Sequence, residues 1–407
     1  MLKQKANYFK IAAIISFSPS MEESGPNIRI LNLAKALRGI CSKIVVFHLG
    51  DESFVYDNIH IIGINSLKYV KKVWPTFLHL LFIQIPYSIN LIKLLDKLGV
   101  DMVIVSESHT LGLFTSLMLL LARKFRLLKS LKLTILDKHN IYHSLIYEML
   151  RIRNKMAIAC KVVSYAIRFL ELIECKLNDA IFVVSKKDAE HVLKHIGASK
   201  YLFVVPNVVE IPISSLDVGS MKERLGIASD QLVLLFIGGL NYSPNLDAVL
   251  LFLKKVFPKL VRHGNIVLLI VGKCGKSMVF ELPNMCKVIS TDYVKDITPY
   301  ILASDLCIVP LRIGSGTRIK ILTCMSYGKV VISTPKGAEG LDLMDGEDII
   351  ISDIDRFHEH ILTIIKDKTL KEYIRRNARD TIKRKYSLNV LSRRLCAILS
   401  LLKHNLS

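Results

Sequence analysis

The segment "VPLRIGSGTRIKILTCMSYGKVVISTPKGAEG", residues 309–340, carries the pattern that decides the fold of this chain. It predicts the end of a strand, a glycine turn, a helix with one apolar side and a second strand. The turn suits phosphate, because Gly314 and Gly316 let the backbone approach an anion closely. The following helix would point free N–H groups and the positive end of its dipole at that anion. Arg318 and Lys320 would add positive side chains, so a pyrophosphate could bind here without a metal.

The helix after the turn has a buried side and a defined end. Ile319, Leu322 and Met325 follow one another at three-residue intervals, which predicts a buried stripe. Gly328 is typical of a helix end and precedes the strand expected at residues 329–334. The pattern alone also fits an ordinary α/β loop with two solvated basic residues. The neighbouring sequence is needed to choose between these interpretations.

Apolar strand-like runs alternate with helical periods along the chain. This alternation predicts an α/β fold with parallel sheets covered by helices on both faces. The 407 residues, 51% of them hydrophobic, suffice for two domains. Periodicity is lost near Pro206 and Asn207, where we expect the boundary. The predicted strands are residues 10–16, 43–48, 102–105, 131–136, 180–184, 232–237, 266–271, 306–309 and 329–334.

Several sequence blocks carry a family resemblance. In the second half they are "FIGGLNYSPNLDAVLLFLKKVFPKL" from Phe236, "VLLIVGK" from Val267, "DYVKDITPYILASDLCIVPLRIGSGTRIKIL" from Asp292 and "GKVVISTPKGAEGL" from Gly328. In the first half they are weaker: "GPNIRILNLAKAL" from Gly25, "LDKHN" from Leu136, "DAIFVVSKKDAEHV" from Asp179 and "VVPNVVE" from Val204. With these blocks the chain resembles the family 4 retaining glycosyltransferases of the GT-B fold (glycosyl transferases group 1), which transfer a sugar from a nucleotide donor.

The resemblance implies the GT-B architecture, in which two Rossmann-like doubly wound domains face an interdomain cleft. We expect an acceptor-side domain over residues 1–207 and a domain that binds the nucleotide sugar over residues 208–387. Residues 388–407 would form a helix that crosses back to the first domain, as the family's C-terminal helices do.

The resemblance also assigns site residues. His139 follows the strand "LKLTILD" and matches a family histidine near the donor sugar, which makes it the candidate catalytic residue. A structural hydrogen bond is its alternative role. Gly25 and Asn27 match the glycine loop of the first domain, which approaches donor phosphate and acceptor. The full set expected to contact donor or phosphate is Gly25, Asn27, Gly238, Gly239, Gly314, Ser315, Gly316, Thr317, Arg318, Lys320 and Thr323.

Two positions depart from the family pattern. The family usually carries two glutamates separated by seven residues on this turn and helix, and the second binds the nucleotide ribose; Ser315 and Thr323 stand in their place. A neutral hydrogen bond from Thr323 would be about 1–2 kcal/mol weaker than a charge-assisted one. The main alternative is therefore a non-catalytic relative that binds nucleotide, a partner chain or a membrane. A GT-B-like epimerase would need acidic groups at the cleft, and none can be placed from the sequence.

The expected chemistry needs no metal and no cofactor. The resemblance implies transfer with retention, in which the leaving phosphate itself accepts the proton of the acceptor. Arg318, Lys320 and the helix N-terminus would stabilise that phosphate, as a divalent metal does in other transferases. The eight cysteines show no metal-ligand or redox spacing.

The charge of the chain points to an anionic partner. The sequence has 56 Lys and Arg against 35 Asp and Glu, a net charge of +21. Basic and apolar residues interleave in "LLARKFRLLKSLKL", residues 120–133, and in "LRIRNKMAIACKVV", residues 150–163. Such stretches suit an anionic membrane surface, and a solvated helix face is the alternative. No nucleic-acid-binding module is recognisable, so nucleic acid is not expected.

We expect a cytoplasmic enzyme, peripheral on the inner face of the cell membrane, that meets a nucleotide-sugar donor and a glycan or lipid-linked acceptor. The first residues, "MLKQKANYFKIAAIISFS", place lysines before a short apolar run, as signal peptides do. We interpret the run as the first strand, because it is short and lacks a small-residue cleavage pattern. Other long apolar stretches are interrupted by polar residues or too short to span a bilayer, so no transmembrane helix is predicted.

Overall fold

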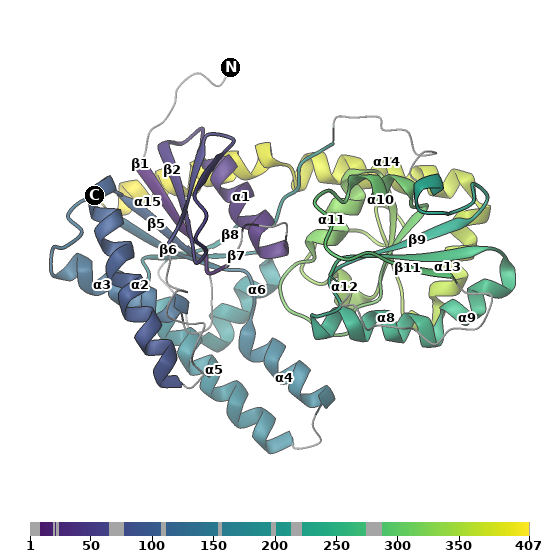
Figure 1. Cartoon of the computed structure of the whole chain (residues 1–407), viewed down its shortest axis with the longest axis horizontal. Helices are drawn as coiled ribbons and strands as arrows, with labels where there is room; N and C mark the ends of the chain where they lie inside the picture. Colours follow the sequence, from purple (N-terminus) through teal and green to yellow (C-terminus); the bar gives the residue numbers. More distant parts are fainter. Residues whose placement is uncertain are drawn as a thin grey trace. The chain divides into compact units, whose positions relative to one another are not determined.

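The chain folds into two α/β units, each built around one sheet (Figure 1). The structure is a computed structural model that describes residues 9–18, 21, 24–64, 77–106, 111–153, 157–196, 201–212, 222–273 and 287–406. The first unit comprises residues 1–207 and 388–407, and the second comprises residues 208–387.

The first unit has a sheet of eight strands within the described ranges, in the order β3-β4-β2-β1-β5-β6-β7-β8. Neighbouring strands pair in parallel, except for β3 and β4, which form an antiparallel hairpin at the edge. The strands are β1 (Phe9–Ile15), β2 (Cys41–His48), β3 (Phe54–Tyr56), β4 (Ile59–Gly63), β5 (Met102–Ser106), β6 (Leu133–Lys138), β7 (Ala180–Val183) and β8 (Leu202–Val204).

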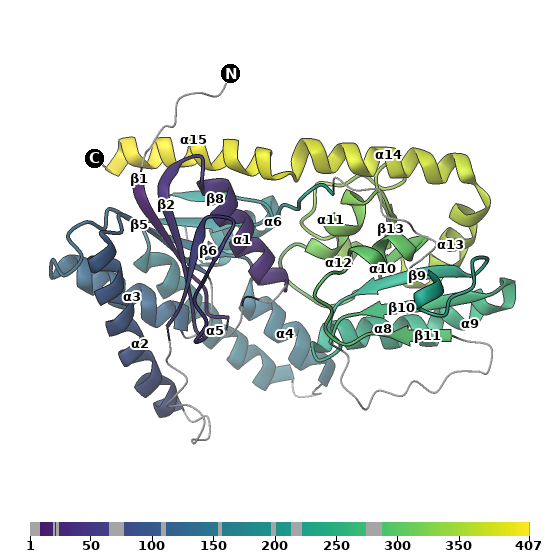
Figure 2. The same cartoon turned by 45° about the horizontal axis from the view of Figure 1, so that its top comes forward.

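Helices cover both faces of this sheet. On one face, Tyr87 and Leu91 of α2 and Leu119 of α3 pack against inward side chains of the strands, such as Val103 and Val105. α1 and α15 lie together on the other face (Figure 2). The helices of this unit are α1 (Gly25–Leu37), α2 (Phe77–Leu98), α3 (Leu111–Lys124), α4 (Tyr142–Arg153), α5 (Ala157–Leu177), α6 (Lys186–His191), the π-helical turn η2 (Val192–Ile196) and α15 (Leu388–Leu406).

The C-terminal helix α15 is tied to the first unit by hydrogen bonds. Ser392 Oγ donates to the carbonyl oxygen of Ala36 at 2.6 Å, and Arg394 Nη1 donates to the carbonyl oxygen of Val204 at 2.9 Å. The last helix of the chain therefore packs on α1 and beside β8.

The second unit has a six-stranded sheet in its described part, in the order β11-β10-β9-β12-β13-β14, and all neighbours are parallel. Its strands are β9 (Leu232–Ile237), β10 (Ile266–Val271), β11 (Lys287–Ser290), β12 (Leu306–Val309), β13 (Val330–Ser333) and β14 (Ile350–Ile351). Its helices are α8 (Ser243–Lys255), α9 (Phe257–Leu260), α10 (Thr298–Ala303), α11 (Ile319–Ser326), α12 (Pro335–Ala338), α13 (Phe357–Lys366) and α14 (Lys368–Lys385), with short 3₁₀ turns η3 (Val261–His263) and η4 (Ile354–Arg356).

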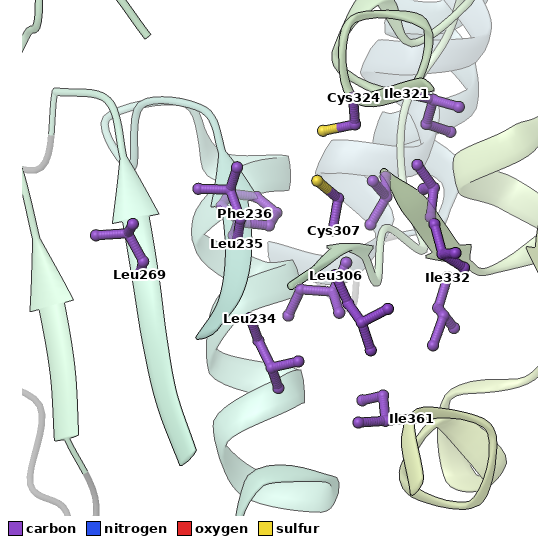
Figure 3. Close-up of a cluster of buried hydrophobic side chains, with 14 of the residues drawn as sticks. Leu234, Leu235, Phe236, Leu269, Leu306, Cys307, Ile321, Cys324, Ile332 and Ile361 are labelled. Carbon is purple, nitrogen blue, oxygen red and sulfur yellow. The ribbon is translucent and has the colours of Figure 1, made fainter. Parts of the chain in front are cut away.

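The core of the second unit explains its continuous apolar strands. Every residue of β10 is buried, as expected where helices cover both faces of a parallel sheet. Figure 3 shows Ile321 and Cys324 of α11 pointing toward β12, where the sulfur atoms of Cys307 and Cys324 face each other. The helix that follows the glycine turn is thus anchored in this core.

The strand order creates a switch point beside β9. The chain leaves β9 for β10 on one side, while β12 pairs with β9 on the other. In open parallel sheets, ligands bind at the carboxyl ends of strands where the order reverses in this way. The loops after β9 and β12 therefore flank the expected binding position of this unit.

The predicted α/β class is confirmed, and all nine predicted strands are present with ends shifted by up to two residues. The run after the N-terminal lysines forms β1, as predicted. None of the described helices combines the length and apolar composition needed to cross a membrane.

Candidate functional site

The glycine turn after β12 is held by the arginine that follows it. Gly314 and Gly316 have φ values of 142° and 68°, which favour glycine. A side chain on Gly314 would also meet the Arg318 guanidinium. Arg318 Nη1 donates to the carbonyl oxygens of Ser315 and Gly316, each at 2.5 Å. The buried Arg318 therefore shapes the turn, in addition to bringing a positive charge to it.

Helix α11 begins directly after this turn, and no side chain bonds to its N-terminal N–H groups at the cap position. Leu322 and Met325 are buried, as predicted, and Gly328 follows the helix with φ 67°. The prediction for Ile319 was wrong, because it is only partly buried. Ile321 and Cys324 are buried alongside Leu322 and Met325, so the buried side of α11 is broader than the predicted stripe and starts at Ile321.

Lys320 lies at the switch point. Its Nζ donates to Asn245 Oδ1 at 2.8 Å and lies 4.4 Å from the ring centroid of Phe236, the side chain near the end of β9. Burial, followed by the nearby Arg318 charge, lowers the pKa of Lys320 from 10.5 to about 7. The amine is therefore a desolvated group whose charge a bound anion would favour.

Glycine is required at the end of β9 by close packing. Gly238 has φ 146°, and a Cβ there would lie 2.8 Å from Lys320 Nζ and 2.6 Å from Asn245 Nδ2. Asn245 Nδ2 donates to the carbonyl oxygen of Gly239 at 2.9 Å. One amide side chain thus links the β9 loop to Lys320. The sequence analysis missed Asn245, although an Asn in the first turn of the helix after "FIGG" was a usable signal.

The remaining predicted residues lie on the turn after β12 and on α11. Ser315 and Thr317 lie within the turn, and both are partly exposed. Thr323 is partly exposed on the second turn of α11, and its hydroxyl makes no hydrogen bond among the residues that the structure describes. The structure therefore brings Gly238 and Gly239 together with Lys320 through Asn245, and Arg318 holds the turn that precedes Lys320 in the chain. Thr323 lies one turn further along α11.

His139 directly follows β6 in the first unit. Its Nδ1 is buried and has no hydrogen-bond partner among the described residues. Burial lowers its pKa from 6.5 to about 4, partly offset by Asp137 and reinforced by the charge of Arg29. The ring is therefore neutral at neutral pH and offers one unused nitrogen.

Gly25 and Asn27 lie at the N-terminus of α1, near the carboxyl end of β1. Ser24 caps this helix by accepting a hydrogen bond from the N–H of Asn27 at 3.4 Å. Arg29, further along α1, bonds to the buried carboxylate of Asp137 at the end of β6. This ion pair links the N-terminal half of α1 to the end of β6, the strand that His139 follows.

No metal centre is apparent in the described portion of the chain, where no group of three or more His, Cys, Asp or Glu side chains is placed to hold an ion. His143 and His191 do meet, with 3.0 Å between their Nε2 atoms, but as a hydrogen-bonded pair.

Sequence comparison finds a family match within the second unit. Residues 231–367, most of that unit, match the family model of glycosyl transferases group 1. A curated relative, described as an uncharacterized 44.6 kDa protein in the cps region of Klebsiella pneumoniae, is 26% identical over 162 residues. That alignment spans 37% of this chain and 42% of the relative, less than half of either.

Solved structures show the fold of the whole chain. Sucrose-phosphate synthase from Thermosynechococcus elongatus is 12% identical with a TM-score of 0.74, covering 97% of this chain and 100% of that one. Anabaena HepE in complex with UDP-glucose is 13% identical with a TM-score of 0.67, covering 96% and 99%. The predicted GT-B fold is thereby confirmed, and so is the resemblance to the group 1 glycosyltransferases over residues 231–367.

Proposed function

We propose that this chain, a glycosyltransferase of the GT-B type, moves a sugar from a UDP- or GDP-linked donor to a glycan or lipid-linked acceptor, with retention at the anomeric carbon. The family match over residues 231–367 supports the reaction class. The likeness to HepE, whose structure contains UDP-glucose, supports a nucleotide-sugar donor.

The observation that carries the proposal is the arrangement at the switch point of the second unit. Arg318 organises the glycine turn, Lys320 lies beside the end of β9, and the N-terminus of α11 has no side-chain cap. Positive charge and N–H donors thus meet at the carboxyl edge of a parallel sheet, where a diphosphate is well accommodated.

The chemistry follows from where negative charge develops. When the bond from the sugar to the diphosphate breaks, the leaving phosphate gains charge, and Arg318, Lys320 and the α11 dipole stabilise it. In our proposal these groups do what a divalent metal does in other transferases. The leaving phosphate takes the proton of the acceptor hydroxyl, and neutral His139 contacts the donor sugar as the catalytic residue.

Nucleotide diphosphate binding should take up a proton between about pH 7 and 8. Lys320 has a pKa of about 7 in the ligand-free protein, and a bound diphosphate favours its charged form. Affinity is therefore highest below about pH 7 and falls as the pH rises, by at most about tenfold per pH unit. Isothermal titration in two buffers of different ionisation enthalpy measures the uptake.

Lys320→Arg is the control, because an arginine stays charged over this range. It should bind nucleotide without proton uptake. Equal uptake by the wild type and Lys320→Arg would show that another group is responsible, and absence of uptake in the wild type would place Lys320 outside the phosphate site.

A nucleotide-binding protein without transferase activity is the second candidate, since Ser315 and Thr323 occupy the positions of the two family glutamates. Thr323→Glu separates the two functions. Thr323 is partly exposed and its hydroxyl has no bond to another described residue, which gives a carboxylate room to reach a ribose hydroxyl, so nucleotide affinity should rise by about 1–2 kcal/mol.

Thr323→Gln is the matched neutral variant and should gain less affinity. The wild type and Thr323→Glu are then assayed for release of nucleoside diphosphate from UDP- and GDP-sugars. Turnover by the wild type supports the transferase. A gain in affinity with no turnover by either protein favours the binding protein.

We also propose that the enzyme works in the cytoplasm, on the inner face of the cell membrane. An exposed apolar stripe on α5 supports the membrane contact. Val162, Tyr165 and Phe169 are 63%, 66% and 61% exposed and share one side of the helix. The two carboxylates of α5, Glu171 and Glu174, are buried, so the exposed side of α5 is apolar and basic. Such a surface suits anionic lipid.

The stretch at residues 120–133 supports the same proposal. Phe125 and Leu127 are exposed, and so are Lys124, Arg126 and Lys129, the basic residues beside them. Arg123 is left out of this lipid-facing set, because its guanidinium makes two bonds to Asp179, at 2.6 and 2.8 Å. In the second basic stretch, residues 150–163, positions 154–156 lie outside the described residues.

Changing Val162, Tyr165 and Phe169 together to Ser should weaken cosedimentation with vesicles that contain phosphatidylglycerol. A control triple variant changes three exposed apolar residues of β3, Phe54, Val55 and Tyr56, to Ser. Replacing Lys124, Arg126 and Lys129 by Gln should cost up to about 1 kcal/mol per charge. Binding that is absent at low salt, or that the α5 and β3 variants lower equally, would contradict the membrane proposal.

A further inference from the structure

One buried carboxylate holds both sides of the segment that carries His139. Glu171 Oε1, on α5, accepts hydrogen bonds from Lys138 Nζ at 2.6 Å and from the N–H of Tyr142 at 2.9 Å. Glu171 Oε2 lies 2.5 Å from His143 Nδ1. Lys138 comes just before His139 in the chain, and the other two partners come just after it. The carboxylate therefore closes the β6–α4 connection into a loop.

The bonds from Lys138, Tyr142 and His143 to Glu171 form a clamp, in which the partners keep Glu171 charged despite its burial. Burial raises the pKa of Glu171, but the charge of Lys138 and hydrogen bonds from His143 and Lys138 outweigh it and lower the pKa to about 2. Glu171 and Lys138 are 4% and 1% exposed. Removing one partner of such a pair leaves an uncompensated buried charge, so the clamp is not easily opened.

The clamp continues to a neighbouring helix. His143 donates from Nδ1 to Glu171, so its Nε2 can accept a hydrogen bond from His191 Nε2, 3.0 Å away on α6. On the other side of His139, Arg29 bonds to Asp137 and holds the end of β6. Both flanks of His139 are thus fixed by buried charged groups.

We propose that Glu171 is a positioning residue for His139: its carboxylate holds the β6–α4 segment so that the imidazole stays in a fixed, water-shielded place. The catalytic consequence of this inference rests on the proposed function, whereas the positional part concerns the first unit alone.

Glu171→Gln tests the positional part. Asp137, Arg29 and Lys138 are the charged groups that act on His139, and burial is the main cause of its pKa of about 4. In the wild type the ring should therefore stay neutral from about pH 5 to 8, while a loosened segment admits water and moves the pKa toward about 6.5. NMR of ¹⁵N-histidine-labelled protein, with the signal assigned through His139→Gln, follows this change. A His139 signal that stays constant over that range in Glu171→Gln overturns the proposal.

Two further variants serve as a control and as an alternative to Glu171→Gln. Glu174→Gln is the matched control: it lies on the same helix, is equally buried, and burial raises its pKa to about 8, so it is mostly protonated at neutral pH. It should leave the His139 signal unchanged. Glu171→Asp keeps the charge near Lys138 but is too short for all its partners, so it should show the new titration even if Glu171→Gln does not fold. Thermal melting and nucleotide binding monitor folding.

Turnover tests the catalytic part. Glu171→Gln should lower kcat by about tenfold or more in the wild-type background and have little effect in a His139→Ala background, because both changes act through one group. Equal losses in both backgrounds would leave Glu171 with a purely structural role. If the wild type turns over no donor, the proposed function fails, and the NMR result still decides whether Glu171 positions His139.

Discussion

Arg318→Ala should weaken nucleoside diphosphate binding by about 2–3 kcal/mol, a loss of roughly 30- to 150-fold in affinity. The variant loses a buried positive charge and the two hydrogen bonds that hold the carbonyl oxygens of Ser315 and Gly316. Gly314 and its neighbours would then sample turn conformations that no longer direct N–H groups at the phosphate. Isothermal titration with UDP and GDP measures the loss.

Arg312→Ala is the matched control. Arg312 belongs to the same loop, but it is exposed and bonded to Asp247 at 2.8 and 2.7 Å, away from the turn. Its removal should change nucleotide affinity by less than about 1 kcal/mol. Similar losses in both variants would indicate a general effect of charge, and an unchanged affinity in Arg318→Ala would contradict the phosphate site.

His139→Ala should reduce kcat about 100-fold or more while nucleotide affinity stays within about threefold. In our proposal the second unit holds the nucleotide, whereas His139 acts from the first unit through its Nδ1, which has no hydrogen-bond partner among the residues that the structure describes. An interaction made with the reacting sugar appears in kcat and leaves ground-state binding nearly intact. Steady-state turnover and nucleotide titration are measured on the same preparation.

The exposed His60, on β4, provides the control for this change, and His60→Ala should behave as the wild type. His139→Gln keeps most of the side-chain volume and should also be slow, which separates lost chemistry from a cavity. Turnover by His139→Ala equal to that of the wild type would return His139 to a structural role.

The sequence predicted the parts of the fold that depend on neighbouring residues, namely the buried strands, the glycine turn and the end of the helix after it. The buried strands were found because their apolar runs are continuous. The glycine turn at Gly314 and the helix end at Gly328 followed from residues that need positive φ. The strands β3, β4, β8, β11 and β14 were missed because they lie at or next to the edges of the sheets, where exposed and partly exposed residues interrupt the apolar run.

Long-range partners in the site could not be predicted. Asn245 contacts Lys320 across 75 residues of sequence, and Glu171 contacts Lys138 across 33. The bond from Arg123 to Asp179, across 56 residues, was likewise not predictable from the local pattern of basic and apolar residues. A single sequence gives the chemistry of each residue but not the tertiary pairing that neutralises or buries it.

Hydrogen exchange of the second unit with and without nucleoside diphosphate tests the central claim most directly. The account predicts that UDP or GDP slows exchange of the backbone N–H groups from Gly314 to Lys320, and that Arg318→Ala abolishes this protection at the same ligand concentration. Nucleotide binding that leaves the exchange of these N–H groups unchanged, or that protects only other segments, would contradict it.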